Sequence, residues 1–245
     1  MEIRVGGLSV VKADMVLDVI CVHSYIGFTR LGRAAGRLRS AGREVELTFR
    51  PYELAPAAPD MAQPLVPVLE SLFGPYARTQ IARATGQAAR EGLMLDYDRA
   101  VVGNTFAAHL LIARAQARGS AEELVERLFR AHFTDGLHIG DPGVLRSLAE
   151  ECGLKPAGSA SGPDGFLRAR ADGSRGGVAW HAEPDAEALR EEMDRLRRHG
   201  VTGVPLFRIG DRVLCGPQTE RALYEALSGS PSRTGGSPAT VGAGR

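Results

Sequence analysis

Cys21 and Ser24 lie three residues apart in the stretch Cys21-Val22-His23-Ser24, where an apolar run gives way to a helical pattern. At the start of a helix, unpaired backbone N–H groups and the positive end of the helix dipole stabilise a thiolate, which is the nucleophilic form of cysteine. The pattern therefore favours a reactive Cys21 whose pKa lies below that of an ordinary thiol. The alternative is that Cys21 is a small buried apolar residue, as free cysteine usually is.

The two polar neighbours of Cys21 could take part in the same chemistry. Ser24 is placed to cap the helix or to donate a hydrogen bond to the sulfur. His23 would lower the pKa of Cys21 further if it were protonated, and could act as a general base if it were neutral. A solvent-exposed loop histidine without a function fits the pattern equally well.

A second candidate element is the stretch Thr202–Phe207, with the sequence TGVPLF, where Pro205 precedes an apolar run. Proline at the first residue of a strand is tolerated because its missing N–H leaves no gap in the sheet. A cis bond between Val204 and Pro205 would instead turn the backbone and leave the Val204 peptide groups open to an extended ligand. The residues alone do not decide between the two.

The remaining cysteines and the histidines suggest no further chemistry. Cys152 and Cys215 cannot form a disulfide framework with Cys21, because one cysteine is left over in any pairing, and we expect both to be buried and inert. His132 and His138 show no recognised metal spacing, so we predict no metal site. Phosphate-binding loops and serine-hydrolase motifs are also lacking in the sequence.

Composition limits the partners. The formal net charge of the 245 residues is +1, which gives no reason to expect a nucleic-acid partner. The sequence holds no run of 18 apolar residues that would span a membrane, and its start lacks a secretory signal pattern. We therefore expect a cytoplasmic protein without a membrane partner.

The elements that must position Cys21 form an α/β pattern at both ends of the chain. Residues 14–21 predict a buried strand, residues 24–40 a helix and residues 44–51 a second strand, which together make a parallel βαβ unit. Near the other end, residues 205–215 predict a tight hairpin with a two-residue, glycine-first turn, flanked by helices. Between the ends, residues 60–155 predict only helices, one of which should start with Asp141 as its cap and Pro142 at its first position. A Gly-, Ser- and Pro-rich loop over residues 156–178 and a low-complexity tail from residue 230 follow the pattern of mobile segments.

Taken together, these motifs resemble the DsbA family of the thioredoxin superfamily, most closely its FrnE-like branch. That branch typically carries Cys-Pro-Trp-Cys-Tyr-Ile-Gly, which CVHSYIG matches here. Further matches are GNTFAAHLLIARA at 103–115, RLFRAHFTDGLHIGDPGVL at 127–145 and GVPLFRIGDRVLCGPQ at 203–218. The resemblance covers most of residues 14–228 and implies that the Val204–Pro205 bond is cis.

The resemblance also implies an α/β architecture, a thioredoxin fold with an inserted all-helical domain. The thioredoxin-like domain would comprise residues 1–58 and 183–229, and we expect residues 14–55 and about 185–228 to form a single sheet. The inserted domain would comprise residues 59–182, with a flexible loop near 156–178, and residues 230–245 would form a disordered tail.

The chain departs from the family at the dithiol. Ser24 stands where the second cysteine is expected, and Val22-His23 replaces Pro-Trp. A second thiol is what resolves the mixed disulfide in dithiol exchange, and a serine cannot do this. The resemblance therefore implies Cys21, His23 and Ser24 as the catalytic residues of a single-thiol site. It places a further set of residues around the substrate: Tyr25, Asn104, Thr105, His109, Val204 and Pro205. From the sequence, Thr105 also fits a helix cap, and His109 could face either the cleft or the core.

Three functions follow as expectations. The first is a thiol-dependent oxidoreductase or isomerase that uses Cys21 for thiol exchange or addition on a small molecule. The association of FrnE-type relatives with aromatic polyketide biosynthesis suggests an aromatic substrate. The second is a glutathione- or mycothiol-dependent isomerase or transferase, as in 2-hydroxychromene-2-carboxylate isomerases and kappa-class glutathione transferases. The third is a binding protein that has lost the dithiol. The resemblance implies no covalently bound cofactor, a low-molecular-weight thiol as partner, and a monomer or homodimer.

Overall fold

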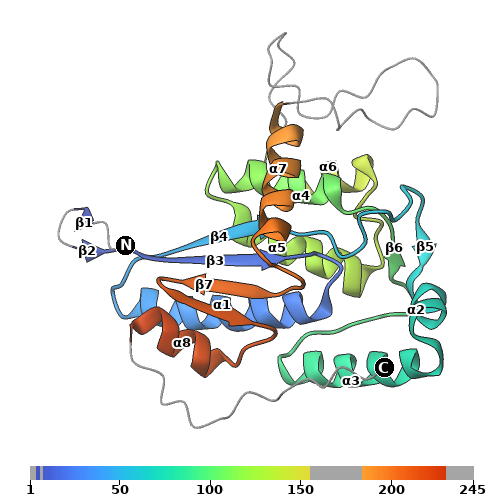
Figure 1. Cartoon of the computed structure of the whole chain (residues 1–245), viewed down its shortest axis with the longest axis horizontal. Coiled ribbons are helices and arrows are strands. Elements are labelled where there is room, and N and C mark those ends of the chain that lie inside the picture. Colours follow the sequence, from blue (N-terminus) through green and yellow to red (C-terminus); the bar gives the residue numbers. More distant parts are fainter. Residues whose placement is uncertain (1–3, 6–7, 155–183, 230–245) are drawn as a thin grey trace.

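Segments from both ends of the chain build one central mixed sheet in the computed structural model, which describes residues 4–5, 8–154 and 184–229. The strand order is β4-β3-β7-β8 (Figure 1). The strands of this sheet are β3 (Val11–Leu17), β4 (Val45–Pro51), β7 (Leu206–Ile209) and β8 (Arg212–Cys215).

The central strand β3 joins the two ends of the chain. Its Met15 lies opposite Phe49 of the parallel strand β4 and opposite Phe207 of the antiparallel strand β7. The predicted pairing of the N-terminal strand with the C-terminal hairpin is therefore confirmed. The predicted bounds of the first strand were wrong, because β3 begins at Val11 and ends at Leu17, and residues 18–21 form the turn that leads into the helix.

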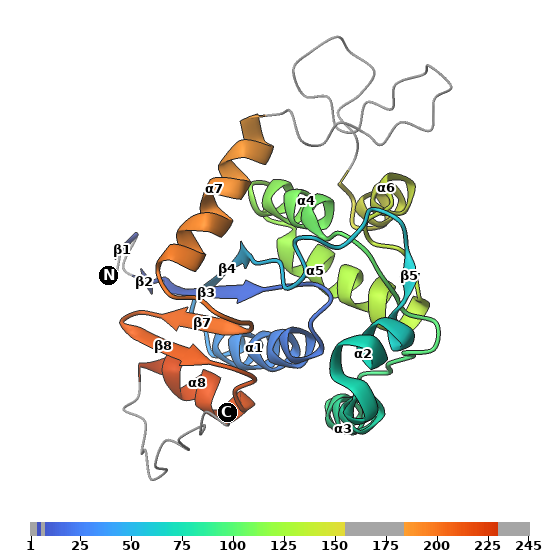
Figure 2. The ribbon, with the colours of Figure 1, turned by 45° about the vertical axis from the view of Figure 1, so that its right-hand side comes forward.

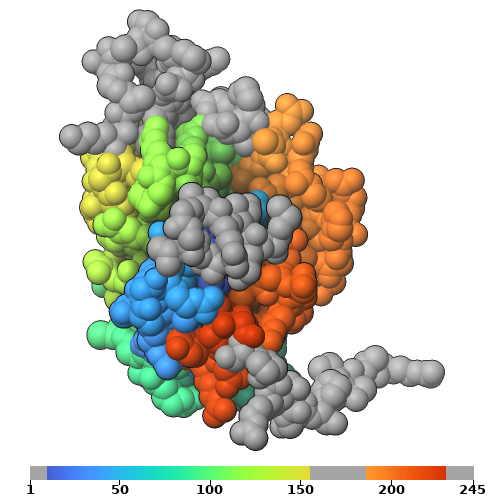
Figure 3. Space-filling view, turned by 90° about the vertical axis from the view of Figure 1, so that its left-hand side faces the viewer, coloured from blue at the N-terminus to red at the C-terminus, as the bar shows by residue number. Residues whose placement is uncertain are grey.

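Two helices, α1 (Val22–Ser40) and α8 (Glu220–Ser228), pack against each other on one face of the sheet. Figure 2 shows α7 (Pro184–Arg198) and α4 (Phe106–Gln116) on the opposite side. In Figure 3 the N-terminal segment in blue and the C-terminal segment in red lie side by side on one face of the molecule. The α/β thioredoxin fold expected from the sequence is thus present.

The described part of the segment between β4 and α7, residues 52–154, is mostly helical. Its helices contribute the apolar faces that pack on α1 and β4; for example, Phe129 contacts Phe28, which in turn contacts Phe49. The elements not yet named are α2 (Leu65–Phe73), η1 (Gly74–Tyr76), α3 (Ala77–Arg90), α5 (Ala121–Arg130), the π-helical turn η2 (Ala131–Asp135) and α6 (Pro142–Glu151).

The sequence predicted only helices in this segment, but the segment also contains strands. A short strand β5 (Gln63–Pro64) pairs with β6 (Val101–Val102), and these strands bracket α2 and α3. Two-residue strands leave no periodic signal in the sequence, which is why the pattern did not reveal them. Another short pair, β1 (Arg4–Val5) with β2 (Leu8–Ser9), precedes the central sheet.

Two local predictions from the sequence, a helix cap and a hairpin turn, are confirmed. Asp141 caps α6 by accepting a hydrogen bond from the Val144 N–H at 2.9 Å, with Pro142 at the first helical position. The hairpin of β7 and β8 has the expected two-residue turn, in which Gly210 takes a φ of +58°. Among the described residues, none of the helices is both long and apolar enough to span a membrane. The loop predicted at 156–178 and the tail from 230 lie outside the described residues.

Candidate active site

Cys21 lies at the junction of the first strand and helix, as predicted. Its N–H donates to the Asp18 carbonyl at 3.0 Å, and its carbonyl accepts from the Tyr25 N–H at 3.0 Å, so Cys21 itself is the N-terminal cap residue of α1. Ser24 is therefore not the cap, because it already lies in the first turn. The Cys21 side chain is only 7% exposed.

The loop before β7 closes over the Cys21 sulfur. The Val204–Pro205 peptide bond is cis, as the family resemblance implies. The Cys21 thiol donates to the Val204 carbonyl across a distance of 3.7 Å between sulfur and oxygen. The Pro205 carbonyl accepts from the Gly216 N–H at 2.8 Å, which ties the loop to the end of the hairpin. Within the described chain, the Val204 N–H makes no hydrogen bond.

Gly27 explains how this loop can approach α1 so closely. A methyl group at position 27 would meet the Phe207 ring at 2.9 Å and Pro205 at 3.2 Å. Glycine therefore permits contact between the helix and the loop that holds the Val204 carbonyl. The Tyr-Ile-Gly stretch thus has a packing role in addition to its value as a family motif.

The expected lowering of the Cys21 pKa was wrong. Burial raises the pKa of the Cys21 thiol above its ordinary value, and the negative charge of Asp18 adds to this effect. The hydroxyl and backbone of Ser24 and the backbone of His23 lower the pKa but do not offset the burial. The helix-start position alone suggested a thiolate, whereas the depth of the sulfur below the surface decides the resting state.

Ser24 is fully buried, and its hydroxyl has no hydrogen-bond partner among the described residues while the thiol is neutral. It still lowers the pKa of Cys21, because a hydroxyl this close can turn toward a negative sulfur. Leaving a buried hydroxyl without a partner costs about 1–3 kcal/mol. Ser24 can therefore donate a hydrogen bond to Cys21 when the sulfur is a thiolate.

A buried acidic cluster beneath Cys21 gave only a faint signal in the sequence, where Asp18 was the single charge in an apolar run. Asp18 is fully buried, accepts from the Leu54 N–H at 2.8 Å and faces the His109 ring nitrogen at 3.3 Å. Glu53 lies nearby, and burial raises the pKa of its carboxyl group. His109 lowers this pKa, whereas the charge of Asp18 raises it further. His109 therefore faces the core and joins α4 to the strand end that carries Cys21.

On its other side, Cys21 is bordered by residues of the segment between β4 and α7, which we call the inserted segment. His23 is exposed and lines a pocket together with Arg83 and Tyr97. Burial lowers the pKa of His23, and Arg83 lowers it further, so His23 is neutral at pH 7 rather than the added charge considered above. Burial raises the pKa of Tyr97 to about 12, and the neighbouring Cys21 contributes to the rise. Sequence reasoning missed both Arg83 and Tyr97, since neither belongs to a motif.

The other predicted substrate-binding residues lie in different surroundings. Tyr25 is buried, and its ring stacks on Phe129 with the centroids 4.8 Å apart, so it packs between α1 and α5. Asn104 accepts from the Phe106 N–H at 2.9 Å and caps α4, whereas the adjacent Thr105 is buried and makes no side-chain cap. No hydrogen bond of the described residues links these three side chains to Cys21.

Two neighbouring histidines, the buried His132 and the partly buried His138, have ring nitrogens without hydrogen-bond partners. Both ring nitrogens of His132 and one of His138 make no hydrogen bond within the described chain. Burial lowers the pKa of His132 to about 4, so its ring is neutral under ordinary conditions. No group of three potential ligands in the described residues could hold a metal ion.

The other cysteines are free and do not pair with Cys21. Cys152 is buried, as expected, and ends α6. Cys215 is exposed, contrary to expectation. It lies opposite Leu206 in the sheet, so the two side chains are on the same face. The next residue, Phe207, is on the other face, where it meets Gly27 of α1, so Cys215 points away from α1.

Comparison with known proteins agrees with this geometry. Residues 12–228 match the family described as DSBA-like thioredoxin domain. A protein of Bacillus subtilis called uncharacterized protein YwbO is 25% identical over 214 residues, which cover 86% of this chain and 92% of that protein.

Solved structures show the same fold. A probable DsbA oxidoreductase from Streptomyces coelicolor has a TM-score of 0.70 and 26% identity, covering 91% of this chain and 93% of that one. A 2-hydroxychromene-2-carboxylate isomerase has a TM-score of 0.56 and 17% identity, with coverage of 89% and 93%. The cytosolic disulfide reductase DsbM from Pseudomonas aeruginosa, solved with GSH, has a TM-score of 0.50 and 24% identity, with coverage of 89% and 94%.

A cysteine capping the first helix, a cis-proline loop over its sulfur and a match along nearly the whole described chain agree with one another. The chain therefore belongs to the DsbA-like thioredoxin domain family.

Proposed function

We propose that this protein is a single-thiol exchange enzyme in which Cys21 takes a thiol group from a small-molecule disulfide and a low-molecular-weight thiol then removes it. One observation carries the proposal: the Cys21 sulfur lies against the Val204 carbonyl, and the buried Ser24 stands where a resolving cysteine would be. A serine can support a thiolate but cannot form a disulfide.

The exchange takes two balanced steps. The Cys21 thiolate attacks one sulfur of a disulfide R–S–S–R′, forming a Cys21–S–S–R bond and releasing R′–S⁻. The thiolate of a free thiol such as glutathione then attacks the R sulfur of this mixed disulfide, forming its own disulfide with R–S and returning the Cys21 thiolate. No electrons are gained or lost overall, since one disulfide is consumed and one is formed.

The position of the other thiols supports an external resolving thiol. Cys215 lies on the sheet face turned away from α1, and Cys152 ends a helix of the inserted segment. All three cysteines are free, so neither Cys152 nor Cys215 is paired with Cys21 in the structure.

The Val204 peptide group supports a peptide-like thiol. Its N–H makes no hydrogen bond within the described chain, so an extended ligand could accept from it while lying across the Cys21 sulfur. The structural neighbour DsbM was solved with glutathione, which makes glutathione the first thiol to test and mycothiol the second. A role in aromatic polyketide biosynthesis and a cytoplasmic location stay predictions.

A direct test follows the mixed disulfide by mass. The protein is incubated with glutathione disulfide, and we expect a glutathione adduct on Cys21 that disappears when excess glutathione is added. The rate of adduct formation should rise with pH beyond the ordinary thiol range, because burial raises the Cys21 pKa. An adduct confined to Cys152 or Cys215 would contradict the proposal.

The raised pKa of Cys21 also favours a second candidate, in which a bound thiol is the nucleophile and the neutral Cys21 only orients it. A Cys21→Ser variant separates the two functions. Under the first proposal, exchange between glutathione disulfide and a second thiol falls to the uncatalysed rate. Under the second, the variant still binds glutathione and still lowers the pKa of the bound thiol, which its ultraviolet thiolate absorbance would report.

A further inference from the structure

A pocket of about 410 Å³ opens beside Cys21, where the start of α1 faces α2 and α3. Val22 and His23, which directly follow Cys21 in the chain, line the pocket, and so does Tyr97, whose pKa the neighbouring Cys21 helps to raise. Figure 2 shows α2 and α3 next to the end of α1 at which the helix begins. A molecule in this pocket would therefore have one end close to the sulfur.

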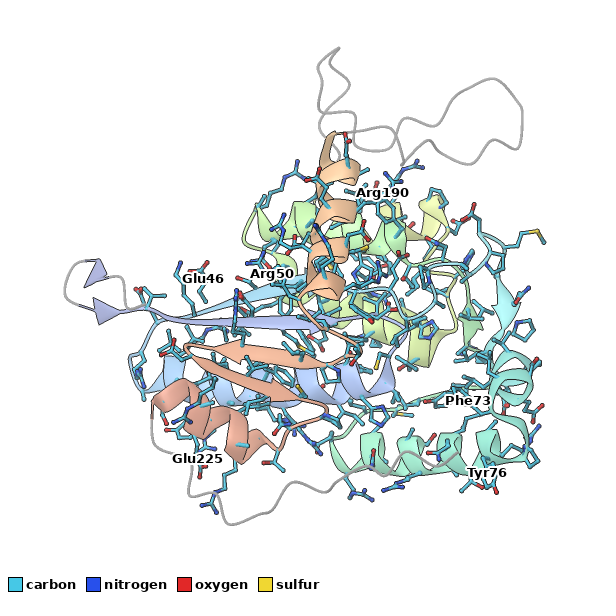
Figure 4. All side chains as sticks on the ribbon, viewed as in Figure 1. Glu46, Arg50, Phe73, Tyr76, Arg190 and Glu225 are labelled. Atoms are coloured by element: carbon cyan, nitrogen blue, oxygen red, sulfur yellow. The ribbon has the colours of Figure 1, made fainter. Side chains whose placement is uncertain are left out.

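The inserted segment contributes several apolar side chains to the pocket wall. Leu69, Phe73 and Ile81 line it, and Phe73 remains 58% exposed although it is a large apolar side chain. Figure 4 labels Phe73 at the end of α2, above α3, and Tyr76 further out along the same side of the molecule. An exposed aromatic ring in a pocket wall favours an apolar or aromatic occupant.

The formal charge among the residues that line the pocket is of one sign. Arg83 is the single charged residue among the residues that line it, and no carboxylate joins them. In the described part of the chain, Arg83 has no ion pair, in contrast to Arg78 on the same helix, which pairs with Glu70 at 2.7 Å. His23 adds no charge at pH 7, because burial and Arg83 lower its pKa. The formal charge that lines the pocket is therefore positive and suits an anionic ligand.

We propose that this pocket binds an apolar, preferably aromatic, group that carries a carboxylate or similar anion, with the anion on Arg83 and the apolar part against Leu69, Phe73 and Ile81. The inference rests on the proposed function and deepens it, since it names the class of substrate that is presented to Cys21. A guanidinium is suited to carboxylate because its planar donors match the two oxygens.

The polar residues of the pocket can orient such a ligand. Tyr97 keeps its proton, since burial raises its pKa to about 12, so its hydroxyl can donate to a ligand atom near Cys21. Gln80 and Gln87 lie on α3 on either side of Arg83 in sequence and also line the pocket. These neutral donors and acceptors add hydrogen bonds without adding a charge that would repel an anion.

A comparison of two aromatic disulfides tests the pocket through Cys21. The anionic reagent is 5,5′-dithiobis(2-nitrobenzoate) and the neutral one is 2,2′-dithiodipyridine, used on a Cys152→Ala, Cys215→Ser background. In both reactions the thiolate of Cys21 forms a disulfide with one aryl sulfur, the reagent's S–S bond breaks, and one aryl thiolate leaves. The nitrobenzoate thiolate is followed by its visible absorbance, and the pyridine thiolate takes up a proton to become pyridine-2-thione, which is followed in the ultraviolet. We expect Arg83→Gln to slow the anionic reagent about fivefold and to leave the neutral reagent unchanged, a loss typical of one partly exposed charge contact. Arg90→Gln, on the same helix, is the matched control and should change neither rate.

Direct binding keeps this inference separable from the proposed function. Fluorescence titration should show 2-naphthoate binding to the wild type, about fivefold weaker binding to Arg83→Gln, and little difference between wild type and variant for neutral 2-naphthamide. If Cys21 reacts with neither disulfide but naphthoate binding depends on Arg83, the exchange function fails and the pocket stands. Equal effects of Arg83→Gln and Arg90→Gln, or no effect of Arg83→Gln on naphthoate, would overturn the pocket assignment.

Discussion

The two sides of Cys21 differ in almost every property. Toward the sheet, the sulfur meets the Val204 carbonyl and the fully buried Ser24, and Gly27 lets the proline loop lie directly on α1. Toward the inserted helices, it borders a pocket whose walls include the exposed His23 and the half-exposed Phe73. One side is closed and tightly packed, and the other is open.

The difference separates two tasks. A close-packed surrounding fixes where the sulfur lies and which of its charge states is stable, because small shifts there are costly. An open surrounding with unpaired groups can accept a ligand without first breaking contacts. We infer that the closed side governs the thiol chemistry and that the open side selects the molecule that reaches it.

The largest effect should come from the sulfur itself. Cys21→Ser should lower thiol exchange about 10³-fold or more, because the hydroxyl is a far weaker nucleophile at neutral pH. Binding of 2-naphthoate should stay within about twofold of the wild type, since the pocket is intact. Exchange is measured with glutathione disulfide and binding by fluorescence; a loss of both would break the separation of the two sides.

The buried His132 should make folding sensitive to acid. Its folded-state pKa of about 4 lies below the ordinary 6.5, so between these values the unfolded chain binds a proton that the folded chain does not. The stability that the neutral ring contributes is complete above about pH 6.5 and falls as the pH drops toward 4, by about 3 kcal/mol.

Urea unfolding across this pH range measures the loss. In His132→Leu, most of it should disappear, whereas replacement of the exposed His199 by asparagine should leave it in place. Parallel pH profiles for the wild type and His132→Leu would show that other groups cause the acid sensitivity.

The close packing of α1 on the proline loop can be tested at one position. Gly27→Ala should lower the free energy of unfolding by about 1–3 kcal/mol, because the new methyl group meets Phe207 at 2.9 Å. Gly36→Ala in the same helix is the control: its methyl group would have no neighbour within 4 Å, so it should stabilise by about 0.5–1 kcal/mol. Thermal unfolding reports both changes, and two variants of equal stability would contradict the packing role of Gly27.

The smallest effect is expected at Ser24. Ser24→Ala should raise the pKa of Cys21 further and slow its alkylation at pH 7–8 a few-fold, because the hydroxyl that lowers this pKa is lost. Stability should not fall, because the substitution removes a buried hydroxyl that makes no hydrogen bond in the described structure of the neutral thiol. The pH profile of iodoacetamide labelling measures the shift; an unchanged profile would mean that Ser24 does not contact the thiolate.

The sequence by itself determined the larger outline of the protein. The strand–helix–strand pattern near the start and the glycine-first hairpin near the end led to the pairing of β3 with β7. The helix beginning near Cys21, the cap at Asp141 and the cis bond before Pro205 also followed from local residues or from the family motif. These features depend on periodicity and on short-range backbone chemistry, which a sequence displays directly.

The tertiary structure alone decided the electrostatics of the site. A helix start predicted a lowered pKa for Cys21, but burial by distant parts of the chain raises it. Arg83 and Tyr97 come from the inserted segment and reach the site only because α1 and α3 pack together. Desolvation and the distances between charges depend on which segments surround a group in space. Arg83 and Tyr97 are 62 and 76 positions away from Cys21 along the chain, so no local pattern around Cys21 reveals that they lie near it.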